Sequence, residues 1–248
     1  IVLTRHLSRL WPVVLLVLLL TGCTSASQLA PIDPNRGIWD KYFVYPLSET
    51  LNWFAELLWG QYGLSILVVT IIIRLLILPL TLKQYQSSKK MQELQPELKK
   101  LQQKYKDNVQ KQQEETIKLF QKHGVNPYAG CLPLLIQMPV LIALYHAIMR
   151  NDKIAGHSFL WMQLGAPDPF YVLPLIAAAT TFLQQKMMSS QMNAQMRGLL
   201  VIFPVLIFVM SMSFASALPL YWIYSNLFTI VQTYFIYGGY RNKGGQAK

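Results

Sequence analysis

Apolar segments of membrane-spanning length are the feature that most constrains the fold of this chain. A helix needs about 20 apolar residues to cross roughly 30 Å of hydrocarbon, and five segments approach or reach that length. The 248 residues are 53% hydrophobic and only 13% charged, whereas soluble domains carry about 25% charged residues. We therefore expect an all-α polytopic membrane protein with five transmembrane helices, at residues 61–83, 131–149, 169–185, 198–217 and 219–237.

The same composition excludes several other classes of protein. The only two cysteines, Cys23 and Cys131, lie far apart, which excludes a secreted scaffold held by disulfides. The apolar content excludes a disordered chain. The net charge of +11 does not indicate direct binding of nucleic acid, because the basic residues are confined to segments between the apolar runs.

The first residues have the pattern of a bacterial export signal with a lipid anchor. Arg5 and Arg9 precede a short apolar run, and the run ends in the sequence LTGC at residues 20–23, which resembles a lipobox. We expect residues 1–22 to be a lipoprotein signal peptide and Cys23 to be the lipidation site. The alternative is a signal-anchor helix in which the cysteine is incidental.

Residues 23–60 mix prolines and polar residues with many aromatic residues, which is typical of a membrane interface. We expect an extracellular segment in which residues 47–58 form an amphipathic helix on the outer membrane surface. Its apolar face would consist of Leu47, Leu51, Phe54 and Leu58. The alternative is a short helix that packs this face on the bundle.

The distribution of basic residues predicts the orientation of the spans. Most lysines and arginines outside the first 22 residues lie in residues 84–127, 186–197 and 238–248, and few lie in residues 23–60 and 150–168. Loops rich in Lys and Arg stay in the cytoplasm. This predicts an external N-terminus, a cytoplasmic loop at 186–197, an extracellular loop at 150–168 and a cytoplasmic tail at 238–248.

Residues 84–127 are predicted to form a cytoplasmic helical hairpin. Apolar residues spaced three and four apart form a seam along one helix, and this seam consists of Met91, Leu94, Leu98, Leu101 and Tyr105. A turn signal at residues 106–108 precedes a second amphipathic helix at residues 109–123. The charged outer face of the hairpin could receive a partner or be simply solvated.

Arg74 is the most informative single residue. It lies within the first predicted span, and the other four spans contain no Asp or Glu. An arginine at mid-span costs about 2.5–3.5 kcal/mol on insertion scales, and its guanidinium cannot escape that cost by losing a proton. The side chains available to surround it are the amides Gln137, Gln184, Gln185, Asn226 and Gln232 and the hydroxyls Thr180, Thr181 and Ser225.

We infer a wet, positively charged cavity that can receive an anion from outside the protein. The alternative is an arginine that amides and carbonyls hold for packing alone. The four histidines are scattered, and no phosphate-binding glycine loop is present. The sequence therefore predicts no enzyme activity, no cofactor and no metal site.

Four short motifs resemble those of the YidC/Oxa/Alb family of membrane protein insertases. They are MQELQP at residues 91–96, NPYAGCLP at 126–133, QMP at 137–139 and LYWIYSN at 220–226. The resemblance extends from about Trp53 to Tyr240, and Arg74 lies where the family has a groove arginine. The lipobox, and the lack of a large extracellular domain between the signal and the first span, resemble the Gram-positive branch of SpoIIIJ-type lipoproteins.

The resemblance implies a hydrophilic groove that is open to the cytoplasm and to lipid and closed to the outside. Arg74 would attract acidic residues of a substrate, and Gln137, Gln184, Trp222 and Asn226 would line the groove. The implied function is a non-enzymatic insertase and chaperone of the bacterial cell membrane, which acts on nascent membrane proteins alone or beside the Sec translocon. The hairpin, rather than the short tail, would contact the ribosome or the signal recognition particle pathway.

Two other functions remain open from the residues alone. One is a small-anion transporter, although the chain shows neither the internal repeats nor the broken helices that transporters usually have. The other is a lipid-handling membrane protein that uses Arg74 to bind phosphate headgroups.

Overall fold

The computed structural model describes residues 30–106, 108–125, 132–188 and 199–244. The predicted signal peptide at 1–22 and the predicted lipidation site Cys23 lie outside the described residues. Most of the motif at 126–133, most of the loop at 186–197 and the end of the tail also lie outside them.

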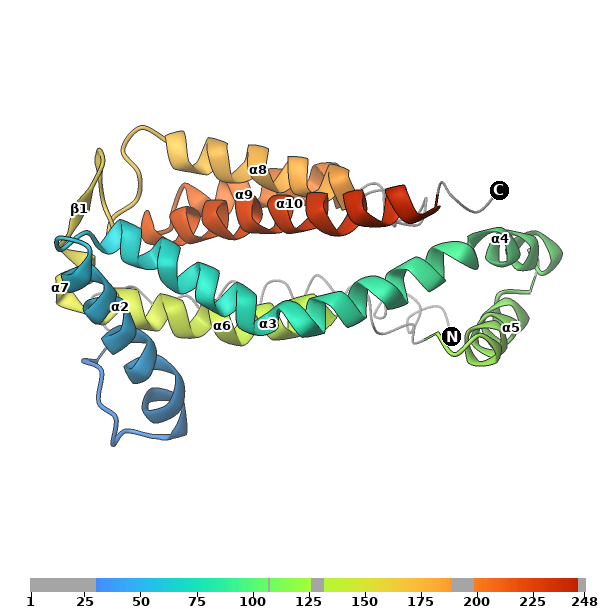
Figure 1. Cartoon of the computed structure of the whole chain (residues 1–248), viewed down its shortest axis with the longest axis horizontal. Coiled ribbons are helices and arrows are strands. Elements are labelled where there is room, and N and C mark those ends of the chain that lie inside the picture. The colour runs from blue at the N-terminus through green and yellow to red at the C-terminus, as the bar shows by residue number, and fades with distance from the viewer. Residues whose placement is uncertain (1–29, 107, 126–131, 189–198, 245–248) are drawn as a thin grey trace, which may run out of the picture.

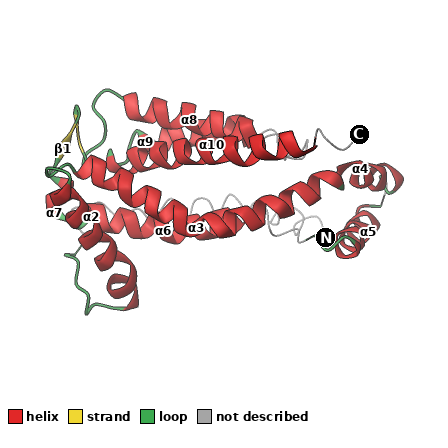
Figure 2. Cartoon of the chain, in the orientation of Figure 1, coloured by secondary structure: helices red, strands yellow, loops and turns green. Residues whose placement is uncertain are grey.

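The described chain is mostly helical (Figure 2), as predicted. Its helices are the π-helical turn η2 (Asp40–Val44), α2 (Tyr45–Leu57), α3 (Tyr62–Glu93), α4 (Gln95–Lys104), α5 (Val109–Lys122), α6 (Leu132–Met149), α7 (Asp152–Ala155), α8 (Val172–Met188), α9 (Leu199–Ser211) and α10 (Ala217–Gly244). One small exception to the all-α prediction is an antiparallel pair of two-residue strands, β1 (Ser158–Phe159) and β2 (Met162–Gln163).

The long helices lie roughly parallel (Figure 1). α8 packs closely on α9 and α10, while α3 packs on α10 and α2. The hairpin α4–α5 projects from one end, and η2, α2, α7 and the β1–β2 pair lie at the other end, which we call the capped end. Among the described residues, one helix, Tyr62–Met91, is long and apolar enough to cross a membrane, and Ile136–Met149 and Leu200–Ser211 are shorter apolar helices.

The first helix of the hairpin differs from the prediction. α3 continues through Pro79 to Glu93. The helix is interrupted at Leu94, and α4 begins at Gln95. Pro96 explains the break, because proline lacks an N–H and its ring clashes with the carbonyl four residues earlier. The predicted seam is therefore not on one helix, since Met91 belongs to α3 whereas Leu98 and Leu101 belong to α4.

The last two helices also have different bounds from the predicted spans at 198–217 and 219–237. α9 ends at Ser211, while α10 begins at Ala217 and continues to Gly244. In the turn between them, Ser216 donates two hydrogen bonds to the Ala166 carbonyl, from its backbone N–H and from its hydroxyl, both at 2.8 Å. These bonds tie the turn to the capped end and mark where α10 starts.

The predicted apolar face of the N-terminal helix is not free to lie on a membrane surface. Leu51 is fully buried in the core, and Leu47 and Phe54 pack against that core. The Ser65 hydroxyl of α3 donates to the Leu51 carbonyl at 2.6 Å. The alternative in which this face packs on the bundle is correct, because α3 and α6 cover it. The side chains that α2 leaves exposed are others, including Trp53 and Leu57.

Residues 156–168 contact the starts of α3 and α10 and the end of α7 at the capped end. The Phe159 ring lies directly over Gly63, so close that a Cβ built on Gly63 would be 2.3 Å from the ring. The Leu164 carbonyl accepts a hydrogen bond from Ala217 N of α10 at 3.0 Å, and Gly165 N donates to the Ala155 carbonyl of α7 at 3.0 Å. This segment therefore connects α3, α7 and α10.

A buried ion pair ties the chain before α2 to the end of α6. Arg150 Nη1 donates to Asp40 Oδ1 at 2.7 Å, and Arg150 Nη2 donates to Asp40 Oδ2. Arg150 also donates to the backbone carbonyls of Ala30 and Pro31, at 2.6 and 2.8 Å. Both charged side chains are more than nine-tenths buried, so removing either one leaves the other charge without its partner.

Asp40→Asn is expected to destabilise the fold by about 3–5 kcal/mol, because it leaves Arg150 buried without a carboxylate. Hydrogen bonding from Arg150 holds the pKa of Asp40 below its ordinary value of 3.8. The pair therefore stabilises the fold fully above that value, and the contribution is lost as the pH falls below it. Thermal unfolding of the purified protein in detergent, measured against pH, checks this.

The matched control for this measurement is Asp33→Asn. Asp33 is an exposed aspartate of the same segment, and asparagine keeps the side-chain oxygen that accepts from Asn35 N. Equal unfolding midpoints for the two variants would contradict the importance of the Asp40–Arg150 pair.

Gly63→Ala is expected to cost about 1–3 kcal/mol, because the new methyl group overlaps the Phe159 ring and forces it to move. Phe159→Leu in the same background should recover part of the loss, since leucine lacks the planar ring. A double-mutant cycle of unfolding free energies measures this coupling. Strictly additive effects of the two substitutions would show that there is no steric coupling between positions 63 and 159.

Candidate functional site

Arg74 lies in α3 and joins three helices through polar side chains. Its Nη2 donates to Gln137 Oε1 of α6 at 3.2 Å and to the hydroxyl of Ser225 of α10. Gln137 Nε2 in turn donates to the Tyr221 hydroxyl of α10 at 2.7 Å. We call Arg74, Gln137, Tyr221 and Ser225 the Arg74 cluster. The sequence prediction that an amide and a hydroxyl surround Arg74 agrees with this arrangement.

The Arg74 cluster contains a positive charge and no negative one. None of the ion pairs formed within the described chain involves Arg74. Its partners are a neutral amide and a hydroxyl, and its Nε and Nη1 have no acceptor among the described residues. Arg74 is also partly exposed. The described residues therefore neither neutralise nor fully enclose the guanidinium, and they leave donors of Arg74 that can bind water or an incoming anion.

The helices around the Arg74 cluster are unevenly packed. Among the described residues, α6 approaches η2, α2 and α7 closely, all at the capped end, and it approaches the backbones of α3 and α10 much less closely. Gln137 nevertheless reaches both α3 and α10 with its side chain. Polar side chains therefore connect α6 to α3 and α10 where the backbones stay apart.

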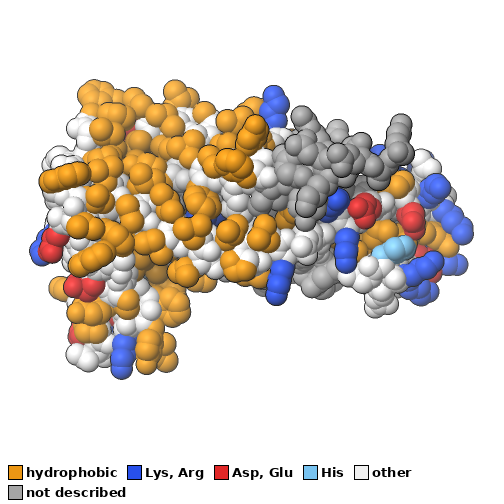
Figure 3. Space-filling view, viewed as in Figure 1, with side chains coloured by type: hydrophobic (Ala, Val, Ile, Leu, Met, Phe, Trp, Pro, Cys, Tyr) orange, Lys and Arg blue, Asp and Glu red, His pale blue; other side chains and the backbone are white. Residues whose placement is uncertain are grey.

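Exposed apolar side chains surround this polar centre. On α3 they include Ile71, Ile72, Leu75, Leu76 and Leu80. The space-filling view shows hydrophobic atoms over most of the helical body, with charged side chains gathered over the hairpin (Figure 3). A soluble protein would not expose so large an apolar surface, whereas lipid tails cover such a surface without cost.

The other predicted site residues lie outside the Arg74 cluster. Asn226 is almost completely buried, and its amide donates to the hydroxyls of Thr180 and Thr181 of α8 at 3.1 and 2.8 Å. Trp222 is partly buried and packs against the core. Gln184 is partly exposed near the end of α8. No described hydrogen bond joins any of these three to Arg74, and Asn226 instead connects α10 to α8.

Sequence reasoning missed one residue of the cluster. Tyr221 is nearly fully buried, and its hydroxyl accepts from the Gln137 amide, so that the amide oxygen is turned toward Arg74. Its spacing gives a usable signal, because Tyr221 and Ser225 are four residues apart and so share one face of α10. That face also meets the helix carrying the arginine.

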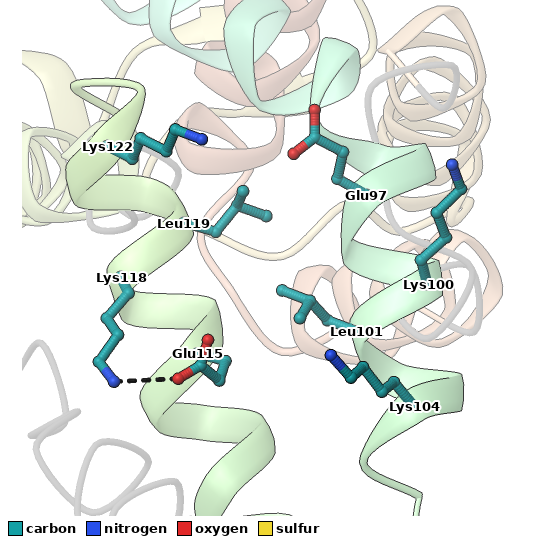
Figure 4. A pocket seen from close by; sticks show the side chains of 8 residues that line it. All are labelled: Glu97, Lys100, Leu101, Lys104, Glu115, Lys118, Leu119 and Lys122. Atoms are coloured by element: carbon teal, nitrogen blue, oxygen red, sulfur yellow. Dashed lines mark hydrogen bonds and ion pairs between the residues drawn. The ribbon is translucent and has the colours of Figure 1, made fainter.

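The hairpin α4–α5 carries a second candidate site. A cleft of about 350 Å³ lies between α4 and α5 and is lined by Glu97, Lys100, Leu101, Lys104, Glu115, Lys118, Leu119 and Lys122. Leu101 and Leu119 point toward each other across the cleft (Figure 4). Hydrogen bonds from Lys118 to Glu114 and Glu115, at 2.8 and 2.9 Å, raise the pKa of Lys118. The cleft thus has an apolar floor and a predominantly basic rim.

The profile of the 60Kd inner membrane protein family matches residues 53–243, which is most of the chain. The chain therefore belongs to this family of membrane proteins, and the resemblance that its motifs carry is confirmed. It is 52% identical over 243 residues to the membrane protein insertase MisCA of Bacillus subtilis strain 168, covering 95% of this chain and 93% of that protein. It is 55% identical over 228 residues to the membrane protein insertase YidC 1 of Halalkalibacterium halodurans, covering 90% and 88%.

A solved structure shows the same fold. The chain superimposes with a TM-score of 0.66 and 28% identity on an active YidC insertase crystal structure with the first transmembrane domain resolved. The match covers 81% of this chain and 47% of that one, so the chain spans about half the length of the solved protein. The relatives are named as insertases and not as enzymes, in agreement with the prediction from the sequence.

Asn226→Ala is expected to lower the unfolding free energy by about 0.6 kcal/mol and by no more than about 1.7 kcal/mol, the average and the maximum for hydrogen bonds between membrane helices. Thr180 and Thr181 also donate to the carbonyls of Ile176 and Ala177, so the substitution leaves neither hydroxyl without a partner. Unfolding of the purified protein in detergent measures the loss. Thr229→Ala is the control, because the Thr229 hydroxyl bonds only within α10 in the described structure. A loss as large for Thr229→Ala would contradict the role of Asn226 in joining the helices.

Proposed function

We propose that the chain is a membrane protein insertase and chaperone that inserts newly made membrane proteins by means of Arg74. The observation that carries the proposal is a guanidinium in an apolar helix, held by a neutral amide and hydroxyl and lacking an acidic partner in the described chain. The names of the relatives support the same function. No cofactor or metal takes part in the proposed action.

The proposed mechanism uses Arg74 as a temporary partner for the client protein. A polar client segment pays a large free-energy cost on entering hydrocarbon, and a carboxylate costs the most. An acidic residue that approaches Arg74 exchanges some of its hydration for a charge-assisted hydrogen bond with the unused guanidinium donors. This lowers the barrier to crossing, while the apolar helix of the client leaves along the exposed faces of α3 and α10 into lipid.

The proposed groove lies between α6 on one side and α3 and α10 on the other. The side chains of the Arg74 cluster cross this space. Gln184, Trp222 and Asn226 remain proposed lining residues, of which Asn226 also joins α10 to α8. The segment of residues 156–168 would close the groove at the capped end, because it ties α3, α7 and α10 together.

We propose a membrane topology in which α3, α6, α8, α9 and α10 are the five spans of a bacterial cell-membrane protein. Apolar side chains exposed along these helices support this assignment. The capped end would face outside, together with an N-terminus anchored through lipidated Cys23. The hairpin and the C-terminus would face the cytoplasm, in keeping with the lysines of α4 and α5.

The proposed partners follow from the same topology. Nascent membrane proteins are the clients, and the Sec translocon can act beside the insertase. The basic rim of the hairpin cleft supports contact with the ribosome or the signal recognition particle pathway at this site. The lipid bilayer surrounds the spans.

Arg74→Ala is expected to reduce client insertion about ten- to a hundredfold, since a hydrogen bond to a charged group contributes roughly 1.5–3 kcal/mol. Arg74→Lys should retain most of the activity, because lysine keeps the charge. Insertion is measured by protease protection in proteoliposomes that contain the purified chain and a client with an acidic outer segment. Arg36→Ala is the control, since Arg36 is an exposed arginine far from the Arg74 cluster in the sequence.

Three results would contradict the proposal. Arg74→Lys as inactive as Arg74→Ala would indicate a purely structural guanidinium. An equal Arg74 dependence for a client whose acidic residues are replaced by amides would remove the proposed role of charge. Uptake of a small anion, or flipping of phospholipid, in place of client insertion would indicate a transporter or a lipid-handling protein.

A further inference from the structure

Four large apolar side chains stand exposed at the capped end, close to the first turn of α8. They are Leu160 and Trp161 at the turn between β1 and β2, and Phe170 and Tyr171 just before α8, and their exposed fractions range from 41% to 69%. We call these four residues the apolar tip. The β1–β2 pair projects beside the start of α8 (Figure 1). The apolar tip belongs neither to the sequence motifs nor to the Arg74 cluster, so the proposed function does not explain it.

The apolar tip is held rigidly rather than carried on a loose loop. Phe159 pairs with Met162 across the turn, and Met162 and Leu164 are buried in the core. Leu160 and Tyr171 both have a φ of +56°, a conformation that large L-residues rarely adopt and that persists only where the surroundings enforce it. The backbone is therefore fixed in the shape that presents these side chains outward.

Asp168 connects the apolar tip to α8. Its Oδ1 accepts from Trp161 Nε1 at 3.0 Å and from Phe170 N at 3.1 Å, and its Oδ2 accepts from Leu173 N at 2.7 Å. Asp168 is itself almost completely buried. One carboxylate thus fixes the indole of the turn and the first residues of the helix relative to each other.

The segment that carries the apolar tip is almost free of charge. From residue 154 to residue 185 the only charged side chain is the buried Asp168. The exposed apolar surface continues from the tip along α8 through Val172, Leu175 and Ile176. Protein interfaces are usually surrounded by a polar rim, whereas Trp and Tyr next to an apolar helix face are typical of the boundary between headgroups and acyl chains.

We propose that the apolar tip inserts into the interfacial layer of the lipid bilayer at the capped end, and that Asp168 thereby fixes the depth at which α8 starts. The occupant of this surface is lipid, and neither a soluble partner nor a second copy of the chain covers it. The proposal requires only that the chain resides in a membrane, as its family does. It is independent of the insertase activity and of which side of the membrane the capped end faces.

Nitroxide spin labels on the full-length chain test the proposal. Leu160→Cys carries the label in one variant, and Lys153→Cys carries it in the control, because Lys153 is an exposed charged residue of α7 at the same end. Cys23 and Cys131 are replaced by serine in both. The purified variants are reconstituted, at high dilution, into vesicles of phosphatidylethanolamine and phosphatidylglycerol, and collisions with oxygen and with a water-soluble nickel chelate are measured.

The ratio of oxygen to nickel accessibility is expected to be several-fold higher at position 160 than at position 153, since oxygen concentrates in lipid and nickel in water. In a third variant, Asp168→Ala added to Leu160→Cys should broaden the range of depths and increase label mobility. A nickel accessibility at position 160 equal to that at 153 would overturn the proposal. Protection of position 160 from both reagents would also overturn it, because it would place the tip against protein.

Discussion

A positive charge that cannot be removed, placed in the middle of an apolar helix, is the constraint on which this structure depends. Arg74 stays protonated, and the described chain supplies it with an amide and a hydroxyl instead of a carboxylate. An internal acid would have stabilised the protein more but would have occupied the guanidinium permanently. Neutral partners orient the guanidinium without neutralising its charge, which is the property that the proposed role of Arg74 in client insertion requires.

The rest of the fold divides into a closed end and a more open end. At the capped end, backbone hydrogen bonds, the contact between Phe159 and Gly63, and the Arg150–Asp40 pair hold the elements together. Among the described residues, α6 has few close backbone contacts with α3 and α10, and side chains such as Gln137 make the connection. Polar side chains therefore make a larger share of the contacts around the Arg74 cluster than they do at the capped end.

Much of this architecture follows from the sequence because hydrophobic length and charge are strong signals. The apolar runs predict most of the long helices, and the lack of acids in them predicts that Arg74 must find neutral partners. Contacts between residues far apart in the sequence leave no comparable pattern in it. Periodicity alone did not reveal that Leu51 faces the bundle, that Asn226 turns to α8, or that Tyr221 orients Gln137, because each depends on which helices become neighbours. Pro96 predicts the helix interruption at Leu94, whereas the heptad spacing of the apolar residues predicts a single continuous helix.

The continuity of α3 connects the hairpin α4–α5 directly to the helix that carries Arg74. This helix runs from Tyr62 to Glu93, about 48 Å by helical rise, and Arg74 lies along it on the way to the hairpin. Pro79 lacks the N–H that would donate to the Leu75 carbonyl, so α3 lacks one backbone hydrogen bond between Arg74 and the hairpin. A displacement of the hairpin would be transmitted along α3, and any bending at Pro79 would reduce the part of it that reaches Arg74.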